Sequence, residues 1–245
     1  MKSLEPDDLE LTRREVVRLL GSFAAAGMLG CAGTGAREAS ESPTTPASPV
    51  GTCVVRPQQT EGPFFVDERL NRSDLRSDPA TGLARPGVPL TVRFRVSRTS
   101  AGLCGPLVGA LVDLWQCDAT GSYSDIGATA GAKFLRGYQV TDSSGVAKFT
   151  TIYPGWYQGR AVHIHFKIRS HTGSGSAYEF TSQLFFDDSI TDQVYTQAPY
   201  NTRGQRTLRN SGDGIYNQGG SQLLLAPAKA AEGYSATFDI GLQMS

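Results

Sequence analysis

The sequence predicts an all-β fold, a β-sandwich core with long loops and few short helices. Short segments of alternating apolar and polar residues recur from residue 88 to residue 242, and turn-forming residues separate them. Helical periodicity is almost absent from the same stretch. Repeated strands without helical periodicity are typical of two packed sheets, so we expect a sandwich.

The expected strands can be placed from the alternation. It is clearest at Leu90, Val92, Phe94 and Val96, which alternate with polar neighbours. Six further strands are expected at residues 109–117, 135–141, 146–152, 162–168, 179–186 and 235–242. The run Asp142-Ser143-Ser144-Gly145 predicts a hairpin turn between two of these strands.

Residues 187–195 form the main helix candidate, which is short and is led by aspartates that suit N-cap positions rather than ligand positions. The segment 198–220 is rich in Asn, Gly, Arg and Gln, and we expect an ordered surface loop that could wall a pocket. Its expected anchors are Tyr200, Leu208, Ile215 and Tyr216.

The beginning of the chain reads as an export signal over residues 1–31. An arginine pair, Arg13-Arg14, precedes an apolar run over residues 19–29, which is typical of the twin-arginine route. The run is too short for a permanent membrane span, which needs about 20 apolar residues. Met28-Leu29-Gly30-Cys31 resembles a lipoprotein processing site, so lipidation at Cys31 and simple cleavage both stay open. The expected location is periplasmic or extracellular, with membrane contact only through such a lipid anchor.

After the signal, residues 32–52 have the composition of a flexible linker, and residues 53–245 are expected to form one folded domain. An exported domain can keep a disulfide, but the sequence leaves open which pair forms among Cys53, Cys104 and Cys117. With 23 basic and 23 acidic residues the formal net charge is zero, and no basic patch indicates a nucleic-acid partner.

Two of the three histidines, His163 and His165, lie in one expected strand. Because side chains alternate along a strand, both rings point to one face while Val162, Ile164 and Phe166 point to the other. This arrangement is that of a two-nitrogen metal clamp backed by a core. Taken alone, such a pair can equally be solvated or hydrogen-bonded, so its surroundings must decide.

Two tyrosines stand at positions from which they could join the histidines. Tyr157 follows a Pro154-Gly155-Trp156 turn six residues before His163, and Tyr123 follows the strand that carries Trp115. A phenol seldom binds metal because its pKa is near 10, but a ferric ion stabilises the phenolate strongly. Any one of the nine tyrosines is more often a core residue, so position must select among them.

Over most of residues 53–220 the chain closely resembles the intradiol ring-cleavage dioxygenases, the family of catechol 1,2-dioxygenases and protocatechuate 3,4-dioxygenase. The motifs that carry the resemblance are Thr60-Glu61-Gly62-Pro63-Phe64-Phe65, Val112-Asp113-Leu114-Trp115-Gln116-Cys117-Asp118-Ala119, Gly121-Ser122-Tyr123-Ser124, Phe134-Leu135-Arg136-Gly137, Thr150-Thr151-Ile152-Tyr153-Pro154-Gly155-Trp156-Tyr157, Arg160 with His163-Ile164-His165, and Thr181-Ser182-Gln183-Leu184-Phe185-Phe186.

The resemblance implies a β-sandwich that binds Fe(III) and uses dioxygen to cleave a catechol-type ortho-dihydroxy aromatic to a cis,cis-muconate-type product. It implies four ferric ligands and three catalytic residues, Tyr157 being in both sets. The implied ligands are Tyr123, Tyr157, His163 and His165; the implied catalytic residues are Tyr157, Arg160 and Gln183.

Two departures from the family pattern limit what the resemblance implies. A signal and a linker stand where catechol 1,2-dioxygenases have a helical dimerisation region, so the oligomeric state stays open. Phe64-Phe65 stands where family members commonly have tyrosines, so the contacts of that loop with substrate also stay open. No motif distinguishes one catechol derivative from another, and Arg203, Arg206 and Arg209 could meet solvent or a substrate carboxylate.

Two other functions compete with this interpretation. A cupin-type or extradiol oxygenase would need a carboxylate beside the two histidines, and residues 166–169 offer none. An exported, non-catalytic β-sandwich that binds a ligand would use Trp115 and Trp156 as surface platforms and would hold no iron. As single residues, Trp115 is expected in the core and His171 in solvent.

Overall fold

The computed structural model describes residues 53–100, 103–171 and 177–244. The predicted signal peptide with Cys31 and the predicted linker lie outside the described residues. Within the described part, no helix combines the length and the apolar character that crossing a membrane requires.

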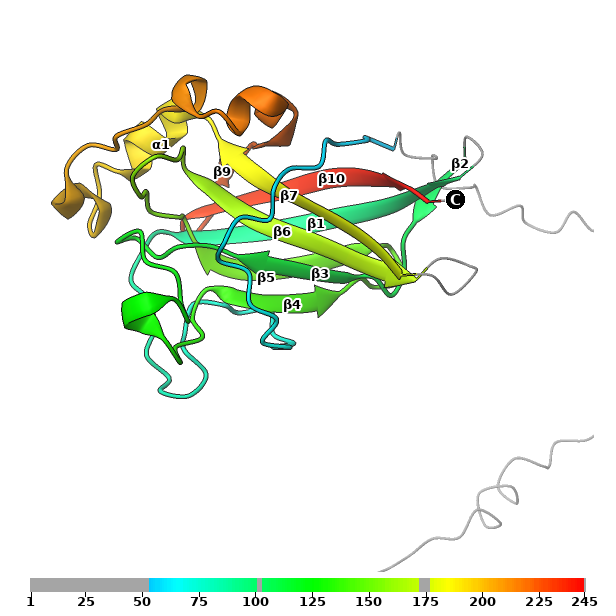
Figure 1. The fold of residues 1–245 in the computed structure, drawn as a ribbon, viewed down its shortest axis with the longest axis horizontal. Helices are drawn as coiled ribbons and strands as arrows, with labels where there is room; N and C mark the ends of the chain where they lie inside the picture. The colour runs from blue at the N-terminus through cyan, green and yellow to red at the C-terminus, as the bar shows by residue number, and fades with distance from the viewer. Residues whose placement is uncertain (1–52, 101–102, 172–176, 245) are drawn as a thin grey trace, which may run out of the picture. The chain divides into compact units, whose positions relative to one another are not determined.

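The described chain folds into two five-stranded sheets, which confirms the predicted all-β sandwich (Figure 1). The first sheet contains β1 (Pro89–Ser100), β2 (Leu103–Pro106), β5 (Val146–Ile152), β9 (Ala228–Lys229) and β10 (Tyr234–Gln243). The second sheet contains β3 (Leu111–Trp115), β4 (Arg136–Val140), β6 (His163–His171), β7 (Ala177–Phe186) and β8 (Leu224–Leu225).

Strand β1 organises the first sheet. Its whole length runs parallel to β10, and its other side pairs with β5 from Pro89 to Arg95 and with β2 from Ser97 to Ser100. The first and last strands of the sandwich are therefore direct neighbours.

The second sheet has the order β4-β3-β6-β7-β8. Its register places Trp115 of β3 opposite His165 of β6, and His165 opposite Gln183 of β7. These three side chains therefore share one face of the sheet, while the intervening Ile164 belongs to the core between the sheets.

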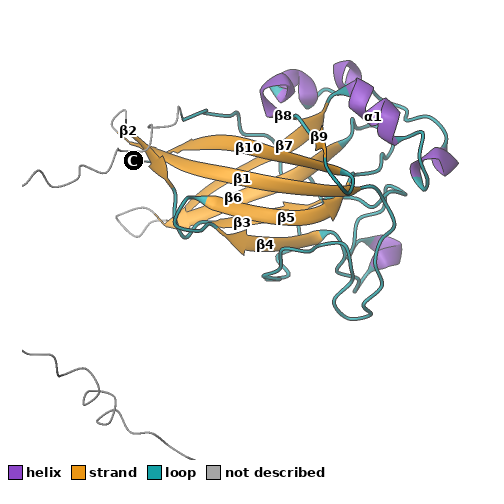
Figure 2. Cartoon of the chain, turned by 180° about the vertical axis from the view of Figure 1, so that it is seen from behind, coloured by secondary structure: helices purple, strands orange, loops and turns teal. Residues whose placement is uncertain are grey.

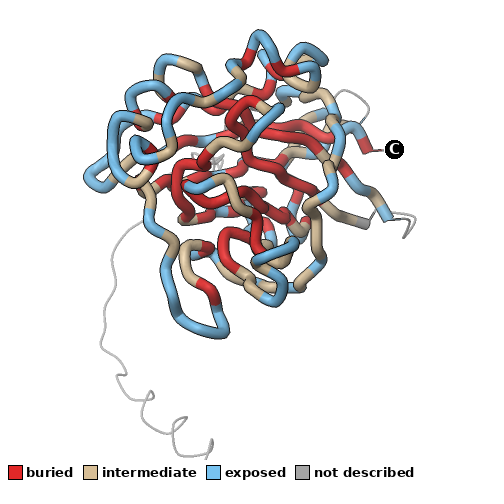
Figure 3. The backbone as a smooth tube through the Cα atoms, turned by 60° about the vertical axis from the view of Figure 1, so that its left-hand side comes forward, coloured by how far each residue is buried: buried red, intermediate tan, exposed pale blue. Residues whose placement is uncertain are grey.

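Aromatic side chains fill the space between the two sheets. The Phe94 ring lies 5.1 Å from that of Phe166 in the opposite sheet, and 6.1 and 6.0 Å from those of Phe149 and Phe238 in its own sheet. All four are almost fully buried, and the buried backbone runs through the strands while the loops carry most of the exposed residues (Figure 3). Burial of this apolar surface is the main force that holds the sheets together.

The segment before β1 covers an edge of each sheet. Asn71 forms a bridge to Tyr138 at the free side of β4, and Asp74 forms one to Thr150 at the side of β5. Exposed strand edges favour unwanted pairing with other chains, so this covering removes two such edges.

Helical segments gather at one end of the sandwich, the end where β6 begins and β7 finishes (Figure 2). The α-helix α1 (Asp188–Val194) matches the expected helix, and Asp187 caps it by accepting a hydrogen bond from the Ser189 amide at 2.7 Å. The short 3-10 turns are η2 (Gly127–Thr129), η3 (Tyr200–Arg203), η4 (Asn210–Gly212), η5 (Tyr216–Gln218) and η6 (Gly220–Leu223).

All seven expected strands are present, and the short β2, β8 and β9 are additional. The prediction of a hairpin at residues 142–145 was wrong in one respect. The turn is closed by the Gly145 amide donating to the Asp142 carbonyl at 2.9 Å, but β4 and β5 belong to different sheets. Turn chemistry is local, whereas the sheet that a strand joins depends on distant partners.

The cysteine pairing that the sequence left open is Cys53 with Cys104. Cys117 is a free, buried thiol, and burial raises its pKa to about 12. This thiol is therefore protonated at neutral pH.

Candidate metal centre

The two histidines at the start of β6 lie on the outer face of the second sheet, away from the core. The His163 and His165 side chains are 2% and 1% exposed, and their Nε2 atoms are 3.0 Å apart. The two rings therefore lie on one face of β6, as strand alternation predicts.

Both predicted tyrosines reach the same point from separate loops. The Tyr157 hydroxyl lies 3.2 Å from His163 Nε2, and the Tyr123 hydroxyl lies 3.5 Å from the same atom. Tyr157 comes from the loop between β5 and β6, and Tyr123 from the loop after β3. All four predicted ligand side chains thus converge on one small volume.

The hydrogen bonding of His163 fixes which ring nitrogen faces the other donors. Its Nδ1 lies 2.7 Å from the carbonyl oxygen of Ala161. A carbonyl only accepts hydrogen bonds, so Nδ1 carries the proton and Nε2 presents a lone pair to the site. Burial, together with the nearby positive charge of Arg160, lowers the pKa of His163 to about 3, so the ring is neutral at pH 7.

The remaining donors are neutral as well. Burial, followed by the neighbouring His163, lowers the pKa of His165 well below its usual value. Burial also raises the pKa of Tyr123 well above its usual range and raises that of Tyr157. The four side chains form a largely buried cluster of two neutral imidazoles and two neutral phenols.

This donor set fits a hard, highly charged metal ion. Ligands bound at about 2 Å to one transition metal lie about 3 Å from each other, which is the spacing seen here. Along the described stretches of chain, no three His, Cys, Asp or Glu side chains come together as a metal site. The potential donors that converge here are therefore imidazole nitrogen and phenol oxygen, a set that fits a ferric ion better than a two-histidine, one-carboxylate centre does.

Aromatic rings surround the donors. The Trp115 indole lies flat against His165, with ring centres 5.0 Å apart and an 8° angle between planes. Phe64 stacks on Tyr123 at 4.4 Å and meets the edge of Tyr157 at 6.0 Å. Trp115 is buried, as expected, but it also supports a site residue, and Phe64 packs on both tyrosines.

Residues 57–66, which we call the strap, run across the outer face of the second sheet. The Gln59 amide donates to the Thr181 carbonyl at 3.0 Å, and Lys167 forms an ion pair with Glu61. Gly62 has φ +72°, and a Cβ atom there would lie 3.2 Å from Cε1 of His165. The backbone of the strap therefore lies close to the histidine ring, and a side chain at position 62 would force the ring or the strap to shift.

Arg160 and Gln183, the other predicted site residues, contact each other beside the four donors. The Arg160 guanidinium donates through Nη2 to Gln183 Oε1 at 2.6 Å, and the Gln183 amide nitrogen donates to the Thr60 carbonyl at 2.9 Å. Gln183 is fully buried. Burial raises the pKa of Tyr157, and the charge of Arg160 opposes that shift.

Two supporting residues were not identified from the sequence. Asp213 accepts a hydrogen bond from Arg160 Nε at 2.9 Å, across 53 residues of chain. Arg136 donates through Nε to the Ser124 hydroxyl at 2.7 Å and also binds the Ser124 carbonyl, next to Tyr123. Arg136 stands in a recognised motif and could have been found there, whereas no local pattern marks Asp213.

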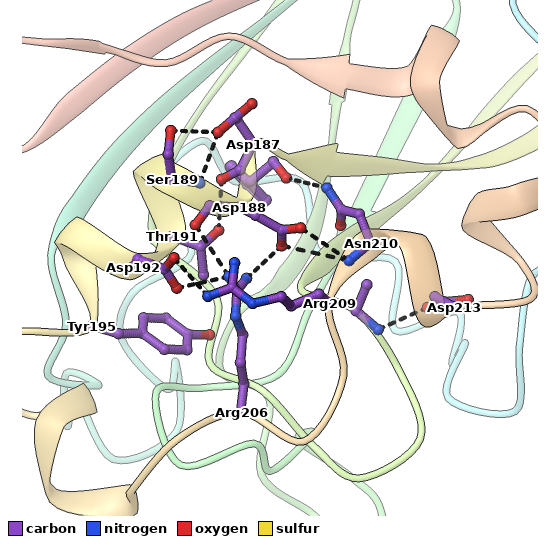
Figure 4. Close-up of polar contacts among 12 residues, drawn as sticks. Asp187, Asp188, Ser189, Thr191, Asp192, Tyr195, Arg206, Arg209, Asn210 and Asp213 are labelled. Carbon is purple, nitrogen blue, oxygen red and sulfur yellow. Dashed lines mark hydrogen bonds and ion pairs between the residues drawn. The ribbon is translucent and has the colours of Figure 1, made fainter.

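The three loop arginines are all engaged by protein groups. Arg203 binds the Trp156 carbonyl and lies over its ring, with 4.6 Å to the ring centre. Arg206 forms ion pairs with Asp188 at 2.8 Å and with Asp192 at 2.7 Å, and Arg209 joins Asp192 at 2.9 Å (Figure 4). The contacts of Arg206 and Arg209 hold the loop to α1, and those of Arg203 hold it to the Trp156 turn. The side chain of His171 lies outside the described residues.

A protein-family model covers the part of the chain that contains this site. The model of the family described as "Dioxygenase" matches residues 60–243, which is most of the chain and includes every site residue named above. The chain belongs to the intradiol ring-cleavage dioxygenase family. Its predicted family membership is thereby confirmed.

Two chlorocatechol 1,2-dioxygenases are similar to part of this chain. The enzyme from Pseudomonas putida is 30% identical over 118 residues, which cover 40% of this chain and 42% of that enzyme. The enzyme from Pseudomonas sp. (strain P51) is 31% identical over 117 residues, which cover 40% of this chain and 44% of that enzyme. The match thus spans less than half of the length of these relatives.

Solved structures match over a larger part of the chain. An intradiol ring-cleavage dioxygenase from Tetranychus urticae is 29% identical with a TM-score of 0.67, covering 78% of this chain and 95% of that one. The dioxygenase domain of a dioxygenase and carbohydrate-binding fusion protein from Streptomyces sp. SirexAA-E is 31% identical with a TM-score of 0.57. That match covers 78% of this chain and 100% of that one.

Proposed function

We propose that this protein is a non-haem Fe(III) intradiol dioxygenase. It cleaves the ring of a catechol-type ortho-dihydroxy aromatic with O2 to a cis,cis-muconate-type product. The observation that carries the proposal is the convergence of two phenol oxygens and an imidazole nitrogen on His163 Nε2, within 3.5 Å and with no carboxylate among them. Family membership supports the same reaction class.

In this proposal Tyr123, Tyr157, His163 and His165 hold the ferric ion. The bound ion supplies Lewis acidity, which lowers the pKa of coordinated phenols and catechol hydroxyls and makes the substrate ring electron-rich toward O2. The stacked Trp115 and the strap keep water away from the imidazoles and hold their orientation. The two buried histidines remain neutral and so are ready to bind metal at pH 7.

Tyr157 is the tyrosine we assign to exchange with substrate. Tyr123 is only 5% exposed and is covered by Phe64, whereas Tyr157 is half-buried and is followed by the exposed Gln158 and Gly159. The Tyr157 oxygen can therefore move outward and accept a proton from a catechol hydroxyl. Tyr123 has no such freedom and stays in place.

Arg160 provides a fixed positive charge beside the site. Its Nε is held by Asp213 and its Nη2 by Gln183, so the guanidinium does not have to reorganise when negative charge develops on the substrate. Such preorganised stabilisation is commonly worth a few kcal/mol in the transition state. Gln183 links this charge to the strap through Thr60.

The proposed location is outside the cytoplasm. A disulfide between Cys53 and Cys104 supports an oxidising compartment, because such bonds are rare in cytosolic proteins. This agrees with a twin-arginine signal over residues 1–31, and lipid attachment at Cys31 is part of the same proposal.

The visible absorption spectrum of the iron-loaded protein tests this function. We expect a tyrosinate-to-ferric charge-transfer band that moves to longer wavelength when catechol is added without oxygen, followed by ring-cleaved product when oxygen is admitted. A protein that stays colourless after ferric loading would refute the assignment and favour a non-catalytic ligand-binding sandwich. Arg160→Ala should lower turnover far more than iron content, because Arg160 is not among the four ligands.

A further inference from the structure

The Asp213 carboxylate occupies an unusual position between the long loop and the candidate site. It is 1% exposed, and four donors surround it. Its Oδ2 accepts from Arg160 Nε at 2.9 Å and from the Ala161 amide at 2.7 Å. Its Oδ1 accepts from the amides of Ile215 at 2.7 Å and Tyr216 at 3.2 Å. Both oxygens are therefore fully used.

The carboxylate is ionised despite its burial. Burial by itself raises the pKa of Asp213, but the Ala161 amide and the Arg160 guanidinium together outweigh it, so the pKa lies below its ordinary value. Among the described residues, Asp213 is the one carboxylate that forms an ion pair with Arg160. A buried, paired charge of this kind has a strongly preferred geometry.

The loop that carries Asp213 is attached to the end of β7 and to α1. Three residues earlier, the Asn210 side chain donates to the Phe186 carbonyl at 2.7 Å, and the Asn210 amide lies 3.3 Å from an Asp188 oxygen. Arg206 fastens the same loop to Asp188 and Asp192 (Figure 4). The loop therefore offers Arg160 a fixed point of attachment.

We propose that Asp213 is the positioning residue for Arg160, setting the direction in which its guanidinium faces Gln183 and Tyr157. Without Asp213, Arg160 would keep its contacts with Gln183 and Tyr157 but would lose the hydrogen bond at Nε, so the direction of its guanidinium would no longer be fixed. The consequence for catalysis rests on the proposed function, but the geometric claim about Arg160 does not.

Asp213→Asn is the sharpest substitution because it preserves shape and changes only the chemistry. All four neighbours are donors, and an asparagine side chain has one acceptor oxygen and one NH2 donor. In either orientation the new NH2 group faces two N–H donors, those of Arg160 and Ala161 or those of Ile215 and Tyr216. Arg160 also loses its counter-ion. Asp192→Asn is the matched control, since it removes a carboxylate that pairs with Arg206 and Arg209 but not with Arg160. The loop stays attached in this variant because Arg206 keeps its ion pair with Asp188.

The first test measures how fast phenylglyoxal modifies Arg160 in the iron-loaded full-length protein, followed by mass spectrometry of the Arg160 peptide. Loss of a charge-assisted hydrogen bond predicts a rate about ten-fold higher in Asp213→Asn, and a rate unchanged by Asp192→Asn. An Arg160 that stays as slow to react in Asp213→Asn as in the unsubstituted protein would overturn the proposal. This readout needs no enzymatic activity.

The second test is a double-mutant cycle on turnover of catechol. Asp213→Asn should lower kcat about ten-fold when Arg160 is present and should lower it no further in an Arg160→Ala background. An equal loss in both backgrounds would mean that Asp213 supports the fold generally, which contradicts a role through Arg160. If the unsubstituted protein turns over no catechol, the proposed function fails while the arginine reactivity still tests the positioning.

A measurement on the unsubstituted protein covers the case in which Asp213→Asn does not fold. The Arg160 Nε–H signal, assigned by its loss in Arg160→Ala, should exchange slowly with water in ¹⁵N-detected NMR spectra because it donates to a buried carboxylate. Rapid exchange of that proton would contradict the proposal.

Discussion

At the level of single residues, the candidate site is a cluster of polar side chains that burial keeps in their neutral forms. Two phenols and two imidazoles are packed together, and burial disfavours the charged form of each. A metal ion reverses this preference for the phenols and uses the lone pairs of the imidazoles. The proposed ferric ion would therefore meet donors that are already close together, and it would stabilise the phenolates that burial disfavours.

Replacing Tyr157 by Phe should weaken the visible phenolate-to-iron band without removing it, because Tyr123 still donates. Tyr178→Phe is the control, since Tyr178 on β7 is a partly buried tyrosine at the opposite end of that strand from the site residues. Absorption spectra of the three iron-loaded proteins at equal iron content make the comparison. A spectrum unchanged by Tyr157→Phe would show that Tyr157 is not a ligand.

The buried histidines should make the metal-free protein acid-sensitive. The pKa of His163 is about 3 in the folded state and that of His165 is also far below the usual value near 6.5, so between these limits the unfolded chain binds more protons. Stability therefore falls as pH drops below about 6.5, by about 1.4 kcal/mol per pH unit for each such histidine.

Urea unfolding of the metal-free protein at several pH values above 5 checks this dependence. His163→Gln should reduce the slope of unfolding free energy against pH, because one of the two titrating groups is gone. Equal slopes in both proteins would contradict the assignment of the pH effect to His163.

Among the elements, β6 and the strap together build the site. Strand β6 sends Ile164 and Phe166 into the core and holds His163 and His165 on the outer face, where the strap covers them. The core-facing side chains fix the strand, so the two histidines on its outer face are held in place without being part of the core. Loops supply Tyr123, Tyr157 and Arg160 to this rigid platform.

The strap can be tested with Gly62→Ala. Gly62 and Gly82 both have φ +72°, but a Cβ at Gly62 would lie 3.2 Å from the His165 ring, whereas one at Gly82 meets nothing within 4 Å. Each substitution should cost about 1 kcal/mol of stability from backbone strain alone. Only Gly62→Ala should also weaken iron binding, measured as iron retained during competition with a chelator. Equal retention in the two variants would show that the strap does not constrain His165.

For the whole molecule, the disulfide joins the start of the described chain to β2, and β2 and α1 lie at opposite ends of the sandwich (Figure 1). The bond closes a loop between residues 51 positions apart. In the chain-entropy model a loop of that length stabilises the fold by up to about 4 kcal/mol.

Cys104→Ser should therefore lower the free energy of unfolding by about 2 to 4 kcal/mol, measured by urea unfolding of the oxidised protein. Cys53→Ser and the double variant should behave identically if the bond itself is responsible. Iron content should be unchanged, because the site lies at the other end. A double variant markedly less stable than either single one would contradict this explanation.

The sequence by itself determined the all-β class, the positions of seven strands and the four side chains that converge at the site. These properties are local: alternation reports which face is buried, and the spacing of His163 and His165 places both rings on one side of a strand. The other site residues were predicted from the motifs shared with the family, which contain Tyr123, Tyr157, Arg160 and Gln183.

Only the tertiary structure decided how distant segments pair. It sends β4 and β5 to different sheets, joins Cys53 to Cys104 and brings Asp213 to Arg160 across 53 residues. No local pattern encodes such contacts, because they depend on which buried faces meet when the whole chain packs. Asp213 is a single aspartate in a polar loop, and its link to the site is visible only in the structure, where four donors surround its carboxylate.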